Sequence, residues 1–276
     1  MENAFYGTLV LLPVLYTLSV IAYARVFSSS GATVSSGMGR YSRPLLVTTI
    51  LFHAGSVAFR GIQIGSCPMG SHWEFFSLVS LSIAITYFFV ELKIHDRNTG
   101  VFVIAVAAFL QLVASAFMLP SKELAEVKLG SLVSLQAITA IVGYSAVLVS
   151  SIYGLLYLSL YGAIKKGSYG LFFRKVPSLE TLCQQNYHAA WVAFFAFTAS
   201  LLFDGLTPMD LPSEVTSSAL LERMVTGAAW ILFGVCVLSR RFFHLGGKRL
   251  AYATVVGFLL PTGLLCAGLI GGGILG

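Results

Sequence analysis

Charged residues are scarce in this chain. Asp, Glu, Lys and Arg make up 10% of its 276 residues, whereas hydrophobic residues make up 57%. A soluble globular domain carries about 25% charged residues, so this chain has too few to cover a surface that faces water. The mean hydropathy of +0.86 agrees with that conclusion. The composition excludes a soluble globular protein and predicts an integral membrane protein.

Recognisable motifs are also lacking. The four cysteines are scattered and form no C-x-x-C pair, which argues against a thiol–disulfide or zinc role, and only Cys67 is expected to face an oxidising compartment. The metalloprotease H-E-x-x-H, the P-loop, the G-x-S-x-G elbow and the glycine-rich dinucleotide fingerprint are all missing. We therefore expect no catalytic residue and favour a role in holding a cofactor or assisting assembly over an enzyme, a choice that the residues alone leave open.

Long continuous apolar runs are what the chain has instead. Because they do not alternate in the manner of barrel strands, they predict spanning helices. Eight of them approach the roughly 20 residues that a spanning helix needs. We expect an all-α integral membrane protein with about eight transmembrane helices in a single polytopic domain over residues 1–276. The expected spans are 4–26, 44–63, 74–92, 101–119, 131–161, 187–204, 224–239 and 250–272.

Positive charge alternates between successive loops. The first, third, fifth and seventh loops are basic, the second has no Lys or Arg, the fourth is balanced and the sixth is acidic. Cytoplasmic loops carry the excess of Lys and Arg, so both termini are expected on the extracytoplasmic side of a membrane, which we take to be the bacterial cytoplasmic (inner) membrane. The excess of 17 basic over 11 acidic residues therefore does not indicate nucleic-acid binding. In the fifth loop, "VPSLETLCQQNYHAAW" predicts a Pro/Ser helix start that leads into the sixth span.

Two ionisable side chains lie inside the second span. His53 and Arg60 are seven residues apart and so lie on about the same face of a helix. His53 is either hydrogen-bonded to a neighbouring helix or a metal or haem ligand, because ionisable groups within a membrane usually mark function. Arg60 either extends to the membrane interface or binds an anionic ligand such as a propionate. The residues themselves leave both choices open.

Trp73 and Glu74 open the third span. A tryptophan at this position suits the aromatic belt at the membrane interface. A carboxylate in the first turn of a helix is a favourable partner for the helix dipole. Each has an ordinary structural explanation, and each also lies close to the expected outer end of the second span.

The order of four segments resembles one known family. "FHAGSVAFRGIQIGSCPMGSHWEFFSLVSLSIAITYFFVE" is similar to its membrane histidine, arginine, Gly/Pro outer loop and aromatic–Glu helix start. "SLVSLQAITAIVGYSAVLVSSIYGLLYLSLYGAIKKG" resembles its long middle span, and "VPSLETLCQQNYHAAWVAFFAFTASLLFDG" its Pro-Ser-Leu-Glu linker and next helix. "AAWILFGVCVLSRRFFHLGGKRLAYATVVGFLL" resembles its last hairpin. The chain thus resembles the cytochrome c assembly proteins of the CcsA/HemX-like type, which are implicated in moving haem across the membrane and presenting it to apocytochrome c.

The chain also departs from that family. The haem-attaching members have a Trp-rich outer segment, whereas the corresponding stretch here, "LTPMDLPSEVTSSALLER", has no tryptophan. Their outer histidine at the start of the middle span corresponds to Gln136, a poor ligand for haem iron, and a further histidine corresponds to about Leu238. Of the expected ligands His53 is the one retained clearly. The Trp-rich haem-presenting segment is therefore degenerate in this chain.

The resemblance implies a haem-handling or cytochrome c maturation accessory protein. Haem is the implied cofactor, with His53 as its iron ligand, Arg60 on a propionate, Trp73 and Glu74 at the outer lip of the site, and Gln136 in place of a histidine. The lipid bilayer and other membrane or cytochrome-assembly proteins are the expected partners. The alternative is a non-haem structural or regulatory subunit whose basic cytoplasmic loops dock a tetrapyrrole-synthesis enzyme or a respiratory complex. A small-solute transporter is disfavoured because matching broken spans are missing.

Overall fold

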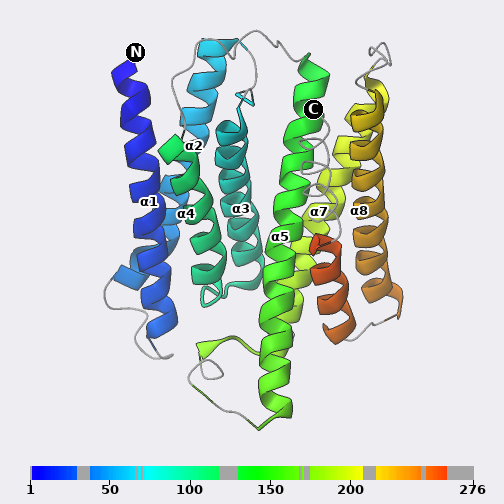
Figure 1. The fold of residues 1–276 in the computed structure, drawn as a ribbon. Coiled ribbons are helices and arrows are strands. Elements are labelled where there is room, and N and C mark those ends of the chain that lie inside the picture. Colours follow the sequence, from blue (N-terminus) through cyan, green and yellow to red (C-terminus); the bar gives the residue numbers. More distant parts are fainter. Residues whose placement is uncertain are drawn as a thin grey trace, which may run out of the picture. The chain divides into compact units, whose positions relative to one another are not determined.

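The structure is a computed structural model that describes residues 2–29, 38–65, 68, 69, 71–117, 130–167, 170, 175–207, 216–243 and 247–259. Within these residues every regular element is helical and no strand occurs, which confirms the expected all-α class (Figure 1). The elements are α1 (Glu2–Ser28), a 3-10 helix η1 (Met38–Tyr41), α2 (Ser42–Ile64), α3 (His72–Ile94), α4 (Gly100–Phe117), α5 (Ser131–Lys165), α7 (Leu179–Leu206), α8 (Thr216–Phe243) and a further helix over 247–259.

Six helices among the described residues are long and apolar enough to cross a membrane. They are α1, α2, α3, α4, α5 and α7, and they coincide with the first six expected spans. The seventh expected span lies in α8, whose apolar stretch, Arg223–Leu238, is shorter. Residues 260–272 of the eighth expected span, like Cys67, lie outside the described residues. Helix α7 begins at Leu179, directly after Pro177 and Ser178, as the Pro/Ser start predicts.

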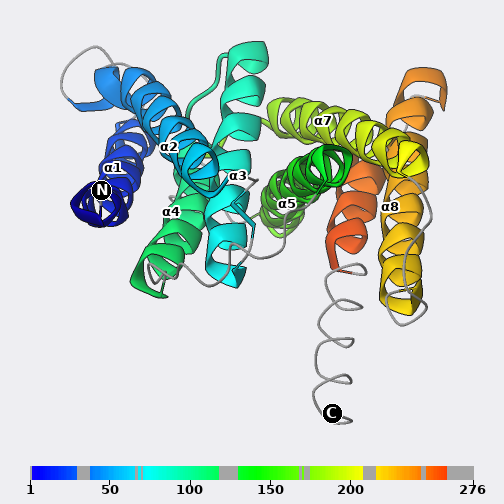
Figure 2. The same ribbon diagram turned by 90° about the horizontal axis from the view of Figure 1, so that it is seen from above.

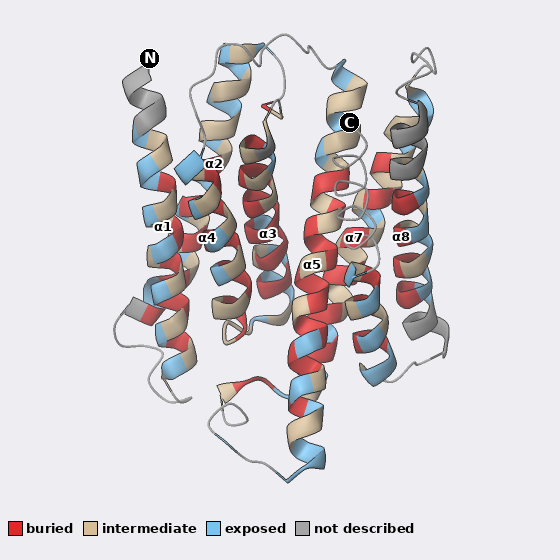
Figure 3. Cartoon of the chain, viewed as in Figure 1, coloured by how far each residue is buried: buried red, intermediate tan, exposed pale blue. Residues whose placement is uncertain are grey.

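The chain divides into two compact units. The first unit comprises Met1–Ser134 and Lys166–Ser178, and the second comprises Leu135–Lys165 and Leu179–Gly276. In the first unit α4 packs against both α1 and α3, and α2 packs against the same two helices, so the four form a closed ring (Figure 2). Consecutive helices of this ring run antiparallel (Figure 1). Helix α3 is the most buried of the six apolar helices (Figure 3).

Small and polar residues bring the helices of the second unit together. A Cβ on Gly143 of α5 would lie 2.6 Å from the Phe197 ring of α7, so glycine is what allows this ring to lie against α5. Asn186 of α7 accepts a hydrogen bond from Ser150 of α5 (2.6 Å) and donates one to Thr254 (3.1 Å). Close packing of small residues and interhelical hydrogen bonds are the forces expected to hold helices together in lipid, where the hydrophobic effect between helices is weak.

A buried carboxylate ties the elements of the first unit together at one end. Glu91 near the end of α3 is fully buried and accepts hydrogen bonds from Tyr23 of α1 (2.5 Å) and Arg43 of α2 (2.9 Å). Arg97, in the connection to α4, lies 3.4 Å from the same carboxylate oxygen as Arg43. Taking a carboxylate out of water is costly unless it is paired and hydrogen-bonded. The three donors together offset this cost, so Glu91 fixes α1, α2 and the α3–α4 connection to one another.

Replacing Glu91 by Gln should destabilise the protein by about 3 kcal/mol, because two buried cationic groups would lose their counter-charge. Unfolding in mild detergent, followed by circular dichroism, measures this loss. Glu180→Gln is the matched control, since Glu180 is exposed and bonded to Gln184 one turn away (3.0 Å), and its loss should be near zero. Equal stabilities of the two variants would contradict the role given to Glu91.

Candidate functional site

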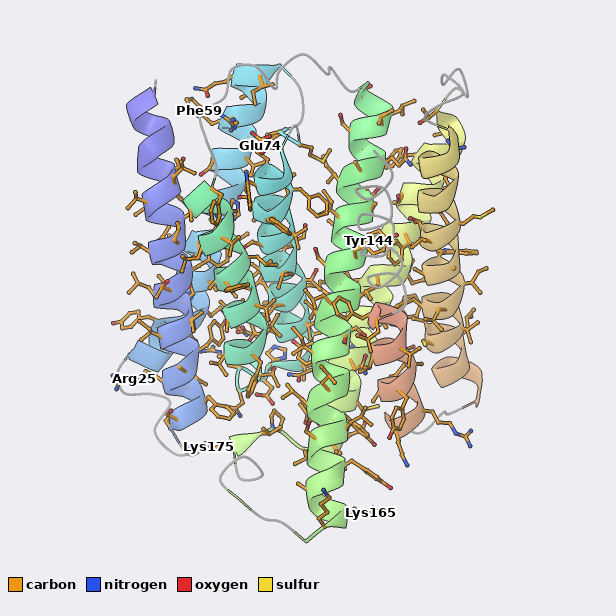
Figure 4. All side chains as sticks on the ribbon, in the orientation of Figure 1. Arg25, Phe59, Glu74, Tyr144, Lys165 and Lys175 are labelled. Atoms are coloured by element: carbon orange, nitrogen blue, oxygen red, sulfur yellow. The ribbon has the colours of Figure 1, made fainter. Side chains whose placement is uncertain are left out.

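The first unit contains a cavity of about 90 Å³ between its four helices. Its polar lining includes His53, Ser56 and Arg60 from α2, Glu74 and Ser77 from α3, and Gln111 from α4. The rest of the lining is mostly apolar and includes Leu9 and Leu12 of α1. Phe59 and Glu74, which also line it, lie near the end of the unit where α2 finishes and α3 begins (Figure 4). The cavity therefore brings together three of the residues singled out from the sequence: His53, Arg60 and Glu74.

Local helix geometry explains how two of these residues come to face the cavity. His53 and Arg60 are seven residues apart on α2, which is two helical turns, so both side chains lie on its inner face. Glu74 is fixed by the start of α3. Ser71 is the N-cap of this helix, and its side chain accepts a hydrogen bond from the backbone N–H of Glu74 (3.1 Å). This Ser-x-x-Glu arrangement is a helix-start signature, and it places the carboxylate in the first turn.

Arg60 and Glu74 form an ion pair at the rim of the cavity. The Nε of Arg60 donates to Oε1 of Glu74 over 2.7 Å, and the two side chains are 20% and 7% exposed. The sequence predicts an anionic partner for Arg60, and in this structure Glu74 is such a partner. The guanidinium is therefore neutralised by a residue of the same chain. An incoming carboxylate or propionate has to compete with Glu74 for it.

His53 is fully buried and hydrogen-bonded on both sides. Its Nδ1 lies 3.0 Å from the hydroxyl of Tyr16 on α1, and its Nε2 lies 3.0 Å from the hydroxyl of Ser77 on α3. The Tyr16 ring also meets the imidazole edge to face, with centroids 5.7 Å apart. This geometry matches the interpretation of His53 as a histidine bonded to neighbouring helices. A metal at Nε2 would have to displace Ser77, and the role of His53 as a haem ligand stays a prediction.

Ser77 continues this polar connection to the fourth helix. Its hydroxyl donates to Oε1 of Gln111 over 3.0 Å, and Nε2 of Gln111 donates to Ser115 over 3.0 Å. Sequence reasoning missed Tyr16, Ser77 and Gln111. Gln111 carried a signal, because an amide inside the apolar run "GVFVIAVAAFLQLVASAF" needs a partner within the bundle. Serines and tyrosines are frequent in the spans of this chain, so Ser77 and Tyr16 carried none.

Trp73 and Gln136 have other surroundings. The Trp73 ring stacks on Phe117 of α4 with centroids 4.8 Å apart, and it does not line the cavity. Gln136 belongs to α5 in the second unit, where its Nε2 donates to Asp204 of α7 over 2.9 Å. Arg223 of α8 donates to the same carboxylate oxygen over 3.0 Å. Both residues thus contact neighbouring helices, and their expected roles toward haem stay predictions.

The described residues contain no cluster of three or more His, Cys, Asp or Glu side chains that could hold a metal ion by themselves. A metal bound only through protein side chains is therefore not what this part of the chain is arranged for. A cofactor that carries its own metal needs just one or two axial ligands from the protein. His53 is the described histidine that lines the cavity.

A double-mutant cycle tests the pairing of Arg60 with Glu74. Each single change, Arg60→Gln or Glu74→Gln, should lower the free energy of unfolding by about 2 kcal/mol, because it leaves a largely buried charge without its partner. The double variant should lose clearly less than the sum of the two, as measured by unfolding in mild detergent. Additive losses would mean that the two side chains do not depend on each other.

No family model, no curated protein and no solved structure matches the chain. The candidate function therefore rests on the residues of the cavity and on the ordered resemblance of its segments.

Proposed function

We propose that this membrane protein handles haem as an accessory in cytochrome c maturation. The observation that carries the proposal is the placing of His53 and Arg60 on one wall of the same cavity. Haem presents an iron, which imidazole ligates, and propionates, which a guanidinium binds. The apolar residues Leu9, Leu12 and Leu78 complete the lining and suit the face of a porphyrin. The resemblance of the ordered segments supports the same assignment.

The fit of haem to these residues depends on rearrangement. Pockets that hold drug-sized molecules have volumes of about 300 Å³ or more, whereas this cavity measures about 90 Å³. Ser77 occupies Nε2 of His53, and Glu74 occupies Arg60. In the haem-bound form Ser77 and Glu74 would give up these partners, His53 would hold the iron, and Arg60 would hold a carboxylate. Bound haem supplies the iron chemistry, and the residues of this chain hold and orient the group.

The membrane orientation belongs to the same proposal. We propose eight spans in the bacterial cytoplasmic membrane with both termini outside the cytoplasm. In the first unit Arg25 and Lys175 lie at the end opposite to Glu74 (Figure 4). Arg43, Lys93 and Arg97 flank helix ends at that same basic end. Because basic residues collect on the cytoplasmic side, this asymmetry supports a cavity near the extracytoplasmic side.

A second candidate function is a non-haem structural or regulatory subunit. The observation that favours it is the completeness of the hydrogen bonds around His53, together with the neutralisation of Arg60 by Glu74. In that case the imidazole serves to hold α1, α2 and α3 together. The basic end of the first unit would then dock a partner, such as a tetrapyrrole-synthesis enzyme or a respiratory complex.

The two candidates differ in whether His53 binds haem. The purified protein in mild detergent, mixed with haem and passed through gel filtration, should carry a Soret band shifted from that of free haem. His53→Gln should lose this band, because an amide can replace the hydrogen bonds of imidazole but is a poor ligand for iron. His95→Asn is the matched control, since His95 lies in the exposed α3–α4 connection with a φ of 61°, which asparagine tolerates.

Three outcomes of this experiment are informative. A band in wild type and His95→Asn but not in His53→Gln supports the proposal. A band that survives in His53→Gln removes His53 as the iron ligand. No band with any of the three proteins leaves the structural or regulatory subunit as the function.

Reporter fusions test the proposed orientation. A periplasmic phosphatase joined to the C-terminus should be active, because that end is expected outside the cytoplasm. The same phosphatase inserted at Gly167, in the basic fifth loop, should be inactive, and a cytoplasmic fluorescent reporter should give the reverse pattern. An inactive phosphatase at the C-terminus would overturn the orientation and place the Glu74 end of the cavity on the cytoplasmic side.

A further inference from the structure

One chain of hydrogen bonds links all four helices of the first unit. It runs from Tyr16 on α1 to His53 on α2, then to Ser77 on α3, and then to Gln111 and Ser115 on α4. Each of these steps is a side-chain contact of 3.0 Å. A buried polar network is costly when it is left incomplete, so every member is under pressure to keep its partner. This network decides what His53 can do.

The direction of the chain follows from its last steps. The amide oxygen of Gln111 can only accept, and its amide nitrogen donates to Ser115, so the hydroxyl of Ser77 donates to Gln111. A serine hydroxyl has one hydrogen, which leaves Ser77 Oγ as an acceptor toward His53. Nε2 of His53 therefore carries the proton. A buried imidazole between two hydroxyl groups is neutral, so its Nδ1 accepts from the hydroxyl of Tyr16.

This tautomer directs the wrong nitrogen toward the cavity for binding a metal. Ser77 and Gln111 line the cavity, whereas Tyr16 does not, so the protonated Nε2 is on the cavity side. A nitrogen that carries a proton has no lone pair to give to iron. For ligation through Nε2, that proton has to leave and another has to be bound at Nδ1, so that the imidazole stays neutral overall. Nδ1–H then donates to the oxygen of Tyr16, and Ser77 loses its donor.

We infer that Ser77 and Tyr16 are positioning residues that set the tautomer of His53, with Ser77 competing against haem iron for Nε2 and Tyr16 supporting the ligating form. The inference rests on the proposed function. Ser77 holds the imidazole in the form that cannot ligate. Tyr16 becomes the acceptor that a metal-bound histidine ordinarily has for its second N–H group.

The two residues should have opposite effects on haem affinity. Ser77→Ala removes the competitor and should tighten haem binding about three- to tenfold, the effect of one lost hydrogen bond. Tyr16→Phe removes the acceptor for Nδ1–H and should weaken binding by about tenfold, as loss of such an outer partner ordinarily does. Alanine is the best helix former, so the helical conformation of α3 is retained in the first variant.

The matched control is Ser80→Ala. Ser80 lies on α3 three residues after Ser77, is equally deep in the first unit, and donates to the backbone oxygen of Ala107 (2.8 Å) rather than to His53. Its haem affinity should equal that of wild type. Ser77→Thr restores the hydroxyl and should return the affinity to the wild-type value.

The experiment titrates haem into wild type and these variants in detergent and follows the Soret band, with iron-free protoporphyrin as a second probe. Protoporphyrin affinity should not change in Ser77→Ala, because the competition is for the iron ligand. The thermal stability of the haem-free Ser77→Ala variant should fall while its haem affinity rises. A merely structural role of Ser77 would lower both.

The outcomes separate this inference from the proposed function. Tighter haem binding by Ser77→Ala, with unchanged Ser80→Ala, supports the competition. Binding that requires His53 but is unchanged or weaker in Ser77→Ala overturns the competition and leaves the proposed function in place. Absence of haem binding in wild type and all variants overturns the proposed function and the inference together.

Discussion

The structure of the first unit depends on keeping the imidazole of His53 hydrogen-bonded on both of its nitrogens inside an apolar bundle. An unpaired imidazole at that depth would cost free energy that lipid-facing surroundings cannot return. Tyr16 and Ser77 supply the two partners, and they come from the helices on either side of α2. The same bonds that stabilise the bundle therefore determine which nitrogen of His53 a ligand in the cavity meets. Stability and ligand binding make competing demands on one side chain.

Buried charges at the two ends of the first unit follow the same rule. Glu91 is surrounded by Tyr23, Arg43 and Arg97 at the basic end, and Glu74 pairs with Arg60 at the other. The two arrangements differ in what they leave possible. Glu91 has three donors from separate elements and serves as a fixed point. Arg60 and Glu74 form a simple pair at the rim of a cavity, which an anionic ligand can exchange at lower cost.

The architecture was readable from the sequence because a lipid environment allows few solutions. Continuous apolar runs at low charge have to be helices, and six of the expected spans are helices that can cross a membrane. The common face of His53 and Arg60 also followed from their spacing on one helix. Pairing between helices did not follow. Arg60 and Glu74 were each noted, but their contact depends on how the α2–α3 connection turns the two helix ends toward each other.

The partners of His53 show the limit of sequence reasoning more sharply. Nothing local distinguishes Ser77 from Ser80 on the same helix, although one bonds to the imidazole and the other to a backbone oxygen. Only the packing of α3 against α2 and α4 separates them. The tautomer of His53 lies one step further away, since it is set by Gln111 on a helix that does not donate to the imidazole at all.

The central claim is that His53 can exchange its hydrogen bonds for ligation of haem iron. Pulsed electron paramagnetic resonance of the protein labelled with ¹⁵N in its histidines, loaded with ferric haem, observes that bond directly. The account predicts a hyperfine coupling between the iron and a histidine ¹⁵N that disappears in His53→Gln. A haem-loaded protein with no such coupling, or with a coupling unchanged in His53→Gln, would contradict it.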